Sequence, residues 1–341
     1  MRIALALVLA AAVAALPLAC EKKAADPKAG GGGGKALRVA LVPKGTAHDY
    51  WKSVHAGGIK AEKELSTATS KVELVFRGPE REDDRDQQIS LVQNLVSTKY
   101  DAIVLAPLDN AALVTPVKAA KDAGIPVVVI DSGLNGEAGK DFVSFVATDN
   151  RKGGGMGGDH LGKLLGGKGK VLILRYLEGS ASTHEREEGF LEAVAKFPDI
   201  NIVDPKRYAG ATRATAQEAA ENLLATNPDI TGVFCPNESS TFGMLLALRS
   251  KGMAGKVRFV GFDASDAAVA ALGAKEIDGL VLQDPVRMGY LGVKTAVEKL
   301  RGVVPPSAID MGVALVTPQN MSDPAMKQLL APDLTSMLEG R

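Results

Sequence analysis

The chain has 341 residues, 46 % of them hydrophobic, so it is long enough for two domains of ordinary size and can bury a sizeable core. Lysine plus arginine equals aspartate plus glutamate, 40 of each, and a chain without a basic excess is a poor candidate for binding nucleic acid. None of the four histidines is paired at a metal-ligand spacing such as H-x-x-x-H, so no metal is expected.

The first residues have the pattern of an export signal. Arg2 is followed by the apolar run IALALVLAAAVAAL and by small residues that end at Cys20. Residues 20–35 are rich in Lys, Ala, Pro and Gly and cannot bury enough apolar surface to fold, so they are expected to form a flexible linker. The only other cysteine, Cys235, is expected to be a small core residue.

From Leu37 onward, short β-branched runs alternate with longer helical patterns. The expected strands are 37–42, 71–76, 101–106, 126–130, 142–146, 170–174, 200–203, 230–234, 256–262, 279–283 and 311–316. Amphipathic stretches such as RDQQISLVQNLVSTK lie between most of them. Continuous apolar strands suit sheets buried on both faces, and strand–helix alternation predicts an α/β fold with parallel sheets. Eleven strands are many for one sheet, so two lobes are the simpler packing.

Polar and aromatic side chains follow several of these strands. Ligands of open α/β sheets bind beyond the carboxyl ends of the strands, so these side chains are candidates for a binding site. For Asp131 and Asp263 the alternative is a helix N-cap, and for Trp51 it is the core. The strand ends offer Lys44, His48, Tyr50 and Trp51 after the first strand, and then Asp131, Asn237, Asp263 and Gln283.

Several longer motifs resemble one family. The motifs, in chain order, are IPVVVIDSG (125–133), VATDNRKGG (146–154), EREEGFLEAV (185–194), VFCPNESSTFGMLLAL (233–248), VGFDAS (260–265) and LVLQDPVRMGYLG (280–292). From about Leu37 to Val316 the chain resembles the type I periplasmic sugar-binding proteins, the ribose-binding proteins in particular. The resemblance implies two Rossmann-like lobes joined by a three-crossover hinge, with the ligand between them.

The same resemblance implies domain boundaries. A signal peptide would span residues 1–19, and a cysteine after small residues resembles the lipobox of bacterial lipoproteins, which implies lipidation of Cys20. Pro17 departs from that pattern, and an ordinary cleaved signal is the alternative. The N-terminal lobe would comprise 36–147 plus 284–309, the C-terminal lobe 148–283 plus 310–322, and a tail 323–341.

The resemblance also implies roles for the strand-end residues. Tyr50 and Trp51 match paired aromatic residues, one of which stacks on the sugar, and Asp131 matches an aspartate that grips ring hydroxyls. Arg186 matches an arginine at a helix start, but the ligand-binding arginine aligns with His184, so this anchor is expected to have changed. The positions that match polar groups from the second lobe and hinge are Asn237, Asp263 and Gln283.

Some positions depart from the ribose pattern. Lys44 replaces a small hydroxyl residue and resembles the lysine of the branch that binds a furanosyl autoinducer; a solvated loop lysine is the alternative. The family's second arginine and its asparagine after the third strand are also missing, which argues against plain ribose. These last two departures are at Ser132 and at Ala106 or Pro107.

Carboxylates and amides bind the hydroxyls of a sugar, and an aromatic ring covers its apolar face. The resemblance implies a monomeric, periplasmic solute-binding lipoprotein that delivers a monosaccharide or polyol to the membrane permease of an ABC importer. It implies no enzyme activity and no cofactor, and a chemoreceptor is a further possible partner. Ligand that contacts both lobes would stabilise their closed arrangement.

Two alternatives remain. One is a ligand that is a furanosyl signal or another non-sugar molecule. The other is an exported dinucleotide-dependent enzyme, because Gly153, Gly155 and Gly158 spell G-x-G-x-x-G and Glu178 follows twenty residues later; here, however, the first glycine does not end a strand. The acidic stretch 78–86 is expected to be a solvated helix start, and a surface that docks on the transporter is the alternative.

Overall fold

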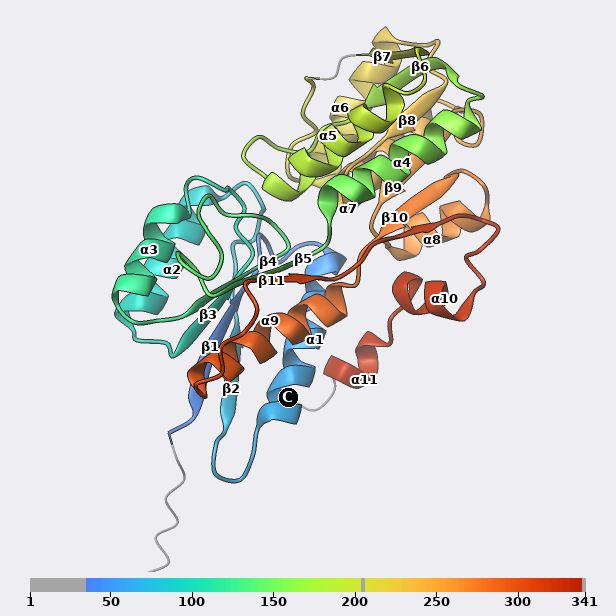
Figure 1. Cartoon of the computed structure of the whole chain (residues 1–341). Coiled ribbons are helices and arrows are strands. Elements are labelled where there is room, and N and C mark those ends of the chain that lie inside the picture. The colour runs from blue at the N-terminus through green and yellow to red at the C-terminus, as the bar shows by residue number, and fades with distance from the viewer. Residues whose placement is uncertain (1–34, 204–205, 339–341) are drawn as a thin grey trace, which may run out of the picture. The chain divides into compact units, whose positions relative to one another are not determined.

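The computed structural model describes residues 35–203 and 206–338. The predicted signal peptide, the lipidation at Cys20 and the predicted linker up to residue 34 lie outside them. The described residues form two six-stranded sheets, each flanked by helices (Figure 1). The predicted α/β class with two lobes is therefore confirmed, whereas the lobe boundaries stay a prediction.

The first sheet is wholly parallel, with strand order β11-β5-β4-β3-β1-β2. Its strands are β1 (Leu37–Val42), β2 (Val72–Phe76), β3 (Ala102–Leu105), β4 (Val127–Ile130), β5 (Ser144–Ala147) and β11 (Ala308–Asp310). Its helices are α1 (Asp49–Leu65), α2 (Arg85–Ser97), α3 (Val114–Asp122) and α9 (Pro285–Leu300). This sheet with its four helices is called the first lobe.

The second sheet has the order β12-β10-β9-β8-β6-β7, and only β12 is antiparallel to its neighbour. Its strands are β6 (Lys168–Ile173), β7 (Asp199–Val203), β8 (Gly232–Phe234), β9 (Arg258–Phe262), β10 (Gly279–Leu282) and β12 (Ala314–Val316). Its helices are α4 (Asn150–Leu164), α5 (Ala181–Val194), α6 (Arg213–Thr226), α7 (Glu238–Ser250) and α8 (Asp266–Gly273). These elements are called the second lobe.

Alternating side chains bury both faces of each sheet. In β1, Val39 and Leu41 pack with α1 and α9, whereas Ala40 and Val42 pack with α2 and α3 on the opposite face. The second sheet is likewise covered by α4 and α5 on one face and by α6, α7 and α8 on the other. Cys235 is a buried free thiol in this core, as predicted.

Glycines let one pair of helices in each lobe approach closely. A methyl group on Gly289 of α9 would lie 1.9 Å from the carbonyl oxygen of Val54 in α1. In the second lobe, a methyl group on Gly154 of α4 would lie 1.9 Å from the carbonyl oxygen of Arg186 in α5. The run of glycines from 153 to 158 lies inside α4, whose N-cap is Asp149, so it forms a helix contact instead of ending a strand.

The chain passes between the two sheets three times: from β5 to α4, from β10 to α9, and from β11 to β12. The third passage corrects the predicted strand 311–316. Residues 308–310 pair with β5 and residues 314–316 pair with β10, so no single strand can span the interval. Gly312, with φ +74°, turns the chain between them.

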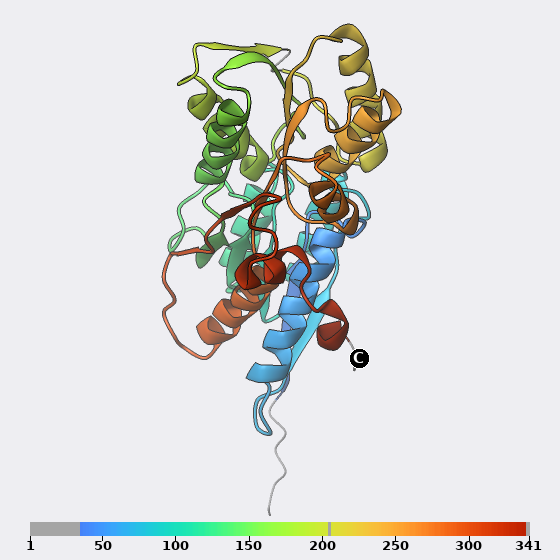
Figure 2. The ribbon, with the colours of Figure 1, turned by 90° about the vertical axis from the view of Figure 1, so that its right-hand side faces the viewer.

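The described part of the predicted tail, residues 323–338, forms two short helices. Residues beyond β12 form α10 (Pro324–Leu330) and α11 (Leu334–Leu338). Leu330 is buried against the core of the second lobe, whereas Leu338 packs against the core of the first. Figure 2 shows α11 beside α1, and the Lys63 ammonium donates to the carbonyl oxygen of Met337 at 3.5 Å. The segment therefore connects both lobes.

Candidate ligand-binding site

The strand ends of the two lobes meet at one cavity. Side chains that are far apart in the sequence line it together, and all are buried or nearly so. The lining residues are Lys44, His48, Tyr50, Trp51, Glu82, Asp131, Tyr176, Ser182, Thr183, Arg186, Asn237, Glu238, Asp263 and Gln283. Nine of the ten residues proposed from the sequence are among them; the tenth, His184, is not.

The lining side chains nearly fill the space between the lobes. About 30 Å³ remains, which is room for about two water molecules, since one water needs at least roughly 10–15 Å³. A monosaccharide needs more room, so its entry requires the lobes to separate or the lining to rearrange. The three passages of the chain between the sheets provide the hinge for such a motion.

Asp131 and Asp263 occupy corresponding places in the two lobes. Asp131 follows β4 and Asp263 follows β9, each the third strand in its sheet order. Both have φ +64°, a left-handed conformation that is uncommon outside glycine and that aspartate tolerates better than most residues. Neither is the N-cap of a helix, because the N-cap of α8 is Ser265 and no helix follows Asp131 directly. Strained backbone of this kind is concentrated at functional sites.

The first lobe contributes an aromatic wall and a buried ion pair. Tyr50 and Trp51 open α1 with their rings 5.0 Å apart at 87°, and both line the cavity while packing in the core. The Tyr50 hydroxyl donates to Asp131 Oδ1 at 2.9 Å, and Lys44 Nζ lies 3.0 Å from Asp131 Oδ2. Lys44 is only 4 % exposed, so it is not a solvated loop lysine.

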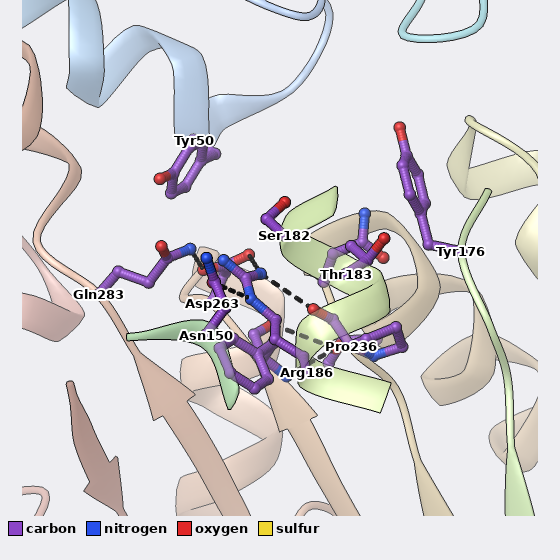
Figure 3. A network of polar contacts seen from close by, with 12 residues as sticks. Tyr50, Asn150, Tyr176, Ser182, Thr183, Arg186, Pro236, Asp263 and Gln283 are labelled. Atoms are coloured by element: carbon purple, nitrogen blue, oxygen red, sulfur yellow. Dashed lines mark hydrogen bonds and ion pairs between the residues drawn. The ribbon is translucent and has the colours of Figure 1, made fainter. Parts of the chain in front are cut away.

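Arg186 organises the second-lobe side of the cavity (Figure 3). Its guanidinium donates to Asn150 Oδ1 at 2.8 Å and to the Pro236 carbonyl oxygen at 3.0 Å, and it lies 3.8 Å from Asp263 Oδ2. The ring of Phe262 packs 4.3 Å beneath it. Gln283 Nε2 donates to the other oxygen of Asp263 at 2.7 Å.

His184 does not reach this cavity, which corrects its assignment from the resemblance. Successive residues of an α-helix are 100° apart, so His184 lies across α5 from both Ser182 and Arg186. It is exposed and lines a different hollow. Arg186, two residues further along α5, is the basic side chain of this helix start that lines the cavity.

Glu82 is the main residue that sequence reasoning missed. It belongs to the stretch 78–86, which was expected to be solvated, but Glu82 is 7 % exposed and accepts hydrogen bonds from three lining side chains. Its neighbours Arg81 and Asp83 are exposed, so nothing local in the sequence distinguishes it. The remainder of the stretch is solvated as expected, apart from buried Pro79.

Sequence patterns could have identified the other lining residues that were missed. Tyr176 stands three positions beyond β6, and Glu238 follows Asn237 after β8, so the strand-end rule covers both. Ser182 and Thr183 lie in the first turn of α5. Asn237 caps α7 by accepting from Ser240 N at 3.3 Å, so it combines a capping role with a place in the lining.

Burial changes the proton affinity of two lining groups. Burial raises the pKa of Asp263 to about 6, although the nearby Arg186 charge and the Gln283 hydrogen bond act in the opposite direction. Burial, together with the charges of Asp131 and Asp263, raises the pKa of Tyr50 well above its usual range, so its hydroxyl stays a donor. Each of the four lining carboxylates has a basic partner: Asp131 has Lys44, Glu82 has His48, Asp263 has Arg186, and Glu238 has Arg213 from just outside the lining.

Comparison with known proteins identifies the family. The model of the periplasmic binding protein domain matches residues 39–303. The chain belongs to this periplasmic binding protein family. A curated relative, the D-ribose/D-allose-binding protein of Pseudomonas aeruginosa, is 31 % identical over 291 residues, covering 82 % of this chain and 88 % of the relative. Periplasmic binding proteins are binding proteins of transport systems, not an enzyme family.

Solved structures show the same fold. An ABC transporter solute-binding protein from Agrobacterium vitis with bound D-fucose is 33 % identical, with a TM-score of 0.83, covering 86 % of this chain and all of that one. A solute-binding protein from Agrobacterium radiobacter in complex with D-arabinose is 36 % identical, with a TM-score of 0.81, covering 87 % and 99 %. Among the described residues there is no cluster of metal-ligating side chains, and no helix there is long and apolar enough to cross a membrane.

Proposed function

We propose that this protein captures a neutral monosaccharide or related polyol between its lobes and delivers it to the permease of an ABC importer. The family and the sugars bound by relatives support the ligand class. Solute-binding proteins of this kind are extracytoplasmic, and closure of the lobes around the ligand presents a recognisable form to the permease.

One observation carries the ligand chemistry. Three buried atoms of the lining have no hydrogen-bond partner among the described residues: Arg186 Nη2, Glu238 Oε2 and Gln283 Oε1. One is a donor and two are acceptors. Leaving such atoms unpaired is costly, and a hydroxyl group can satisfy either kind because it both donates and accepts. A polyhydroxylated ligand would therefore supply hydrogen-bond partners for these three buried atoms.

The charge of the lining narrows the class further. The basic groups around the cavity are already paired with its carboxylates, so none is left to balance the charge of a uronate or a sugar phosphate, and a neutral ligand is favoured. The rings of Tyr50 and Trp51 offer an apolar face for the C–H surface of a pyranose or furanose.

A thermal-shift screen tests the proposal, followed by calorimetry on each hit. The panel contains pentoses, hexoses, inositols, furanosyl signals and matched uronates. We expect stabilisation by at least one neutral member and by no uronate. A panel in which only charged or non-hydroxylated compounds stabilise the protein would contradict the assignment, and a furanosyl hit alone would favour the signalling alternative suggested by Lys44.

The proposal includes a lipid anchor at Cys20, supported by the small residues before it in the sequence. It also includes a monomeric state and a chemoreceptor as a further partner. Metabolic labelling with a fatty acid tests the anchor: wild type should be labelled and the Cys20→Ser variant should not. Equal labelling of both would remove the anchor from the proposal.

A further inference from the structure

Glu82 divides its two carboxylate oxygens between the lobes. Oε1 accepts the indole N–H of Trp51 at 2.7 Å and the ring Nδ1–H of His48 at 2.6 Å, both from the first lobe. Oε2 accepts the hydroxyl of Tyr176, which belongs to the second lobe. Glu82 is thus the meeting point of three side chains that line the cavity.

The charge of Glu82 strengthens all three bonds. Burial opposes its ionisation, but the hydrogen bond and charge of His48, the charge of Lys44 and the bond from Tyr176 lower the pKa of Glu82 to about 2. Burial likewise opposes the charge of His48, yet the bond to Glu82 and its charge raise the pKa of His48. An ionised carboxylate accepts stronger hydrogen bonds than a neutral one, so Glu82 holds its three donor side chains firmly.

Tyr176 can reach Glu82 only when the lobes are together. Tyr176 is 1 % exposed and lies beyond β6, whereas Glu82 lies beyond β2 on the other sheet. Other side-chain contacts also cross between the lobes. The Lys44 ammonium donates to the buried Ser182 hydroxyl at 2.9 Å, and the Arg213–Asp49 ion pair at 3.2 Å has side chains 33 % and 48 % exposed and is weakened by solvent. The buried Tyr176–Glu82 bond is stronger than the exposed ion pair, and of these contacts it is the one that ends on the carboxylate holding Trp51 and His48.

We propose that Glu82 is a positioning residue that couples the ligand-lining side chains to lobe closure: it fixes Trp51 and His48 on one side and is fastened by the Tyr176 hydroxyl when the lobes close. This inference rests on the proposed function in one respect: it assumes that the closed form is the form that retains a sugar. It assigns to Glu82 no contact with the sugar.

The Tyr176–Glu82 hydrogen bond between the lobes is called the latch. Two variants test it against a matched control. Tyr176→Phe removes only the hydroxyl that crosses between the lobes. Tyr290→Phe removes the same chemical group from another tyrosine–glutamate bond, the 2.8 Å contact to Glu64, which lies within the first lobe. Glu82→Gln keeps the size of the side chain and removes its charge.

Closure is measured by energy transfer between dyes on cysteines introduced at the exposed positions Lys118 and Lys251, one on each lobe, in a Cys20→Ser background. Cys235 is buried and will not be labelled. Stopped-flow dissociation of the best sugar from the screen gives the lifetime of the closed complex. Trp51 is the only tryptophan, so its single indole N–H resonance reports directly on Glu82.

We expect Tyr176→Phe to release the sugar roughly 10- to 100-fold faster, the worth of one hydrogen bond to a charged group, with its association rate little changed. Tyr290→Phe should behave like wild type. Glu82→Gln should shift the indole resonance, which a general loss of stability would not do. The dissociation effects of Glu82→Gln and Tyr176→Phe should fail to add in the double variant, because both act through one contact.

Equal dissociation rates for Tyr176→Phe and Tyr290→Phe would overturn the latch while leaving sugar binding intact. Failure of wild type to bind any sugar would instead overturn the proposed function. In that case the ligand-free energy-transfer distributions decide the latch: a smaller closed fraction in Tyr176→Phe than in Tyr290→Phe supports it, and identical distributions reject it.

Discussion

Asp131→Asn is the substitution that most directly tests the first-lobe half of the site. Asparagine tolerates the left-handed backbone of this position, at φ +64°, so the variant keeps the local conformation and removes the charge. The carboxylate now holds the Lys44 ammonium at 3.0 Å and accepts the Tyr50 hydroxyl at 2.9 Å, with all three groups buried. The substitution therefore leaves a buried cation without its counter-charge.

Breaking a buried ion pair costs about 3–5 kcal/mol. Lys44 keeps the hydroxyl of Ser182 at 2.9 Å, so we expect a loss of unfolding free energy near the lower end, about 3 kcal/mol. For the sugar, one acceptor oxygen becomes a donor and the other loses its charge. The loss should be about 2–4 kcal/mol, which is roughly a 30- to 700-fold weaker Kd.

Denaturant unfolding and calorimetry on the purified chain measure both quantities. Asp122→Asn is the matched control, because it removes an exposed ion pair to Lys118 in the same lobe and should change stability by less than about 1 kcal/mol. If Asp131→Asn unfolds and binds sugar as the control does, the buried pair does not hold the site and our placement of the cleft is refuted.

Three further predictions concern packing, pH and the C-terminal segment. Gly154→Ala should cost about 1–3 kcal/mol of unfolding free energy, because its methyl group would lie 1.9 Å from a carbonyl oxygen of α5; Gly155→Ala, with 3.7 Å of clearance, is the matched control. Asp263, with its pKa raised to about 6, gives stability that is full below about pH 4 and lost as the pH rises through about 6. Sugar hydroxyls that donate to its ionised form should make affinity fall below about pH 6 and release protons on binding, which calorimetry in buffers of different ionisation enthalpy detects. Leu338→Asp should detach α11 from α1 and raise hydrogen exchange there, whereas Thr335→Asp on the exposed face of α11 should not.

Each of these has a clear contrary result. Equal stability of the two alanine variants would mean that α4 and α5 can separate without cost. Sugar affinity independent of pH between 5 and 7 would mean that the Asp263 proton is not linked to binding. Equal exchange in the two α11 variants would show that the contact with the first lobe is not maintained in solution.

Local patterns determined much of this protein in advance. Continuous apolar strands alternating with amphipathic helices fixed the α/β class, because strand and helix periods are properties of neighbouring residues. The strand-end rule located Lys44, Asp131, Asn237, Asp263 and Gln283, since parallel strands bring their carboxyl ends to one edge whatever their order in the chain.

Only the tertiary structure decided which residues of a loop or helix turn inward. His184 and Arg186 differ by two helical positions, and that rotation places one in solvent and the other in the cavity. Glu82 stands among exposed charges, and its burial depends on side chains from two other segments: His48 and Trp51 at the start of α1, and Tyr176 beyond β6. Burial and pairing are properties of the assembled lobes, and no local stretch of sequence contains them.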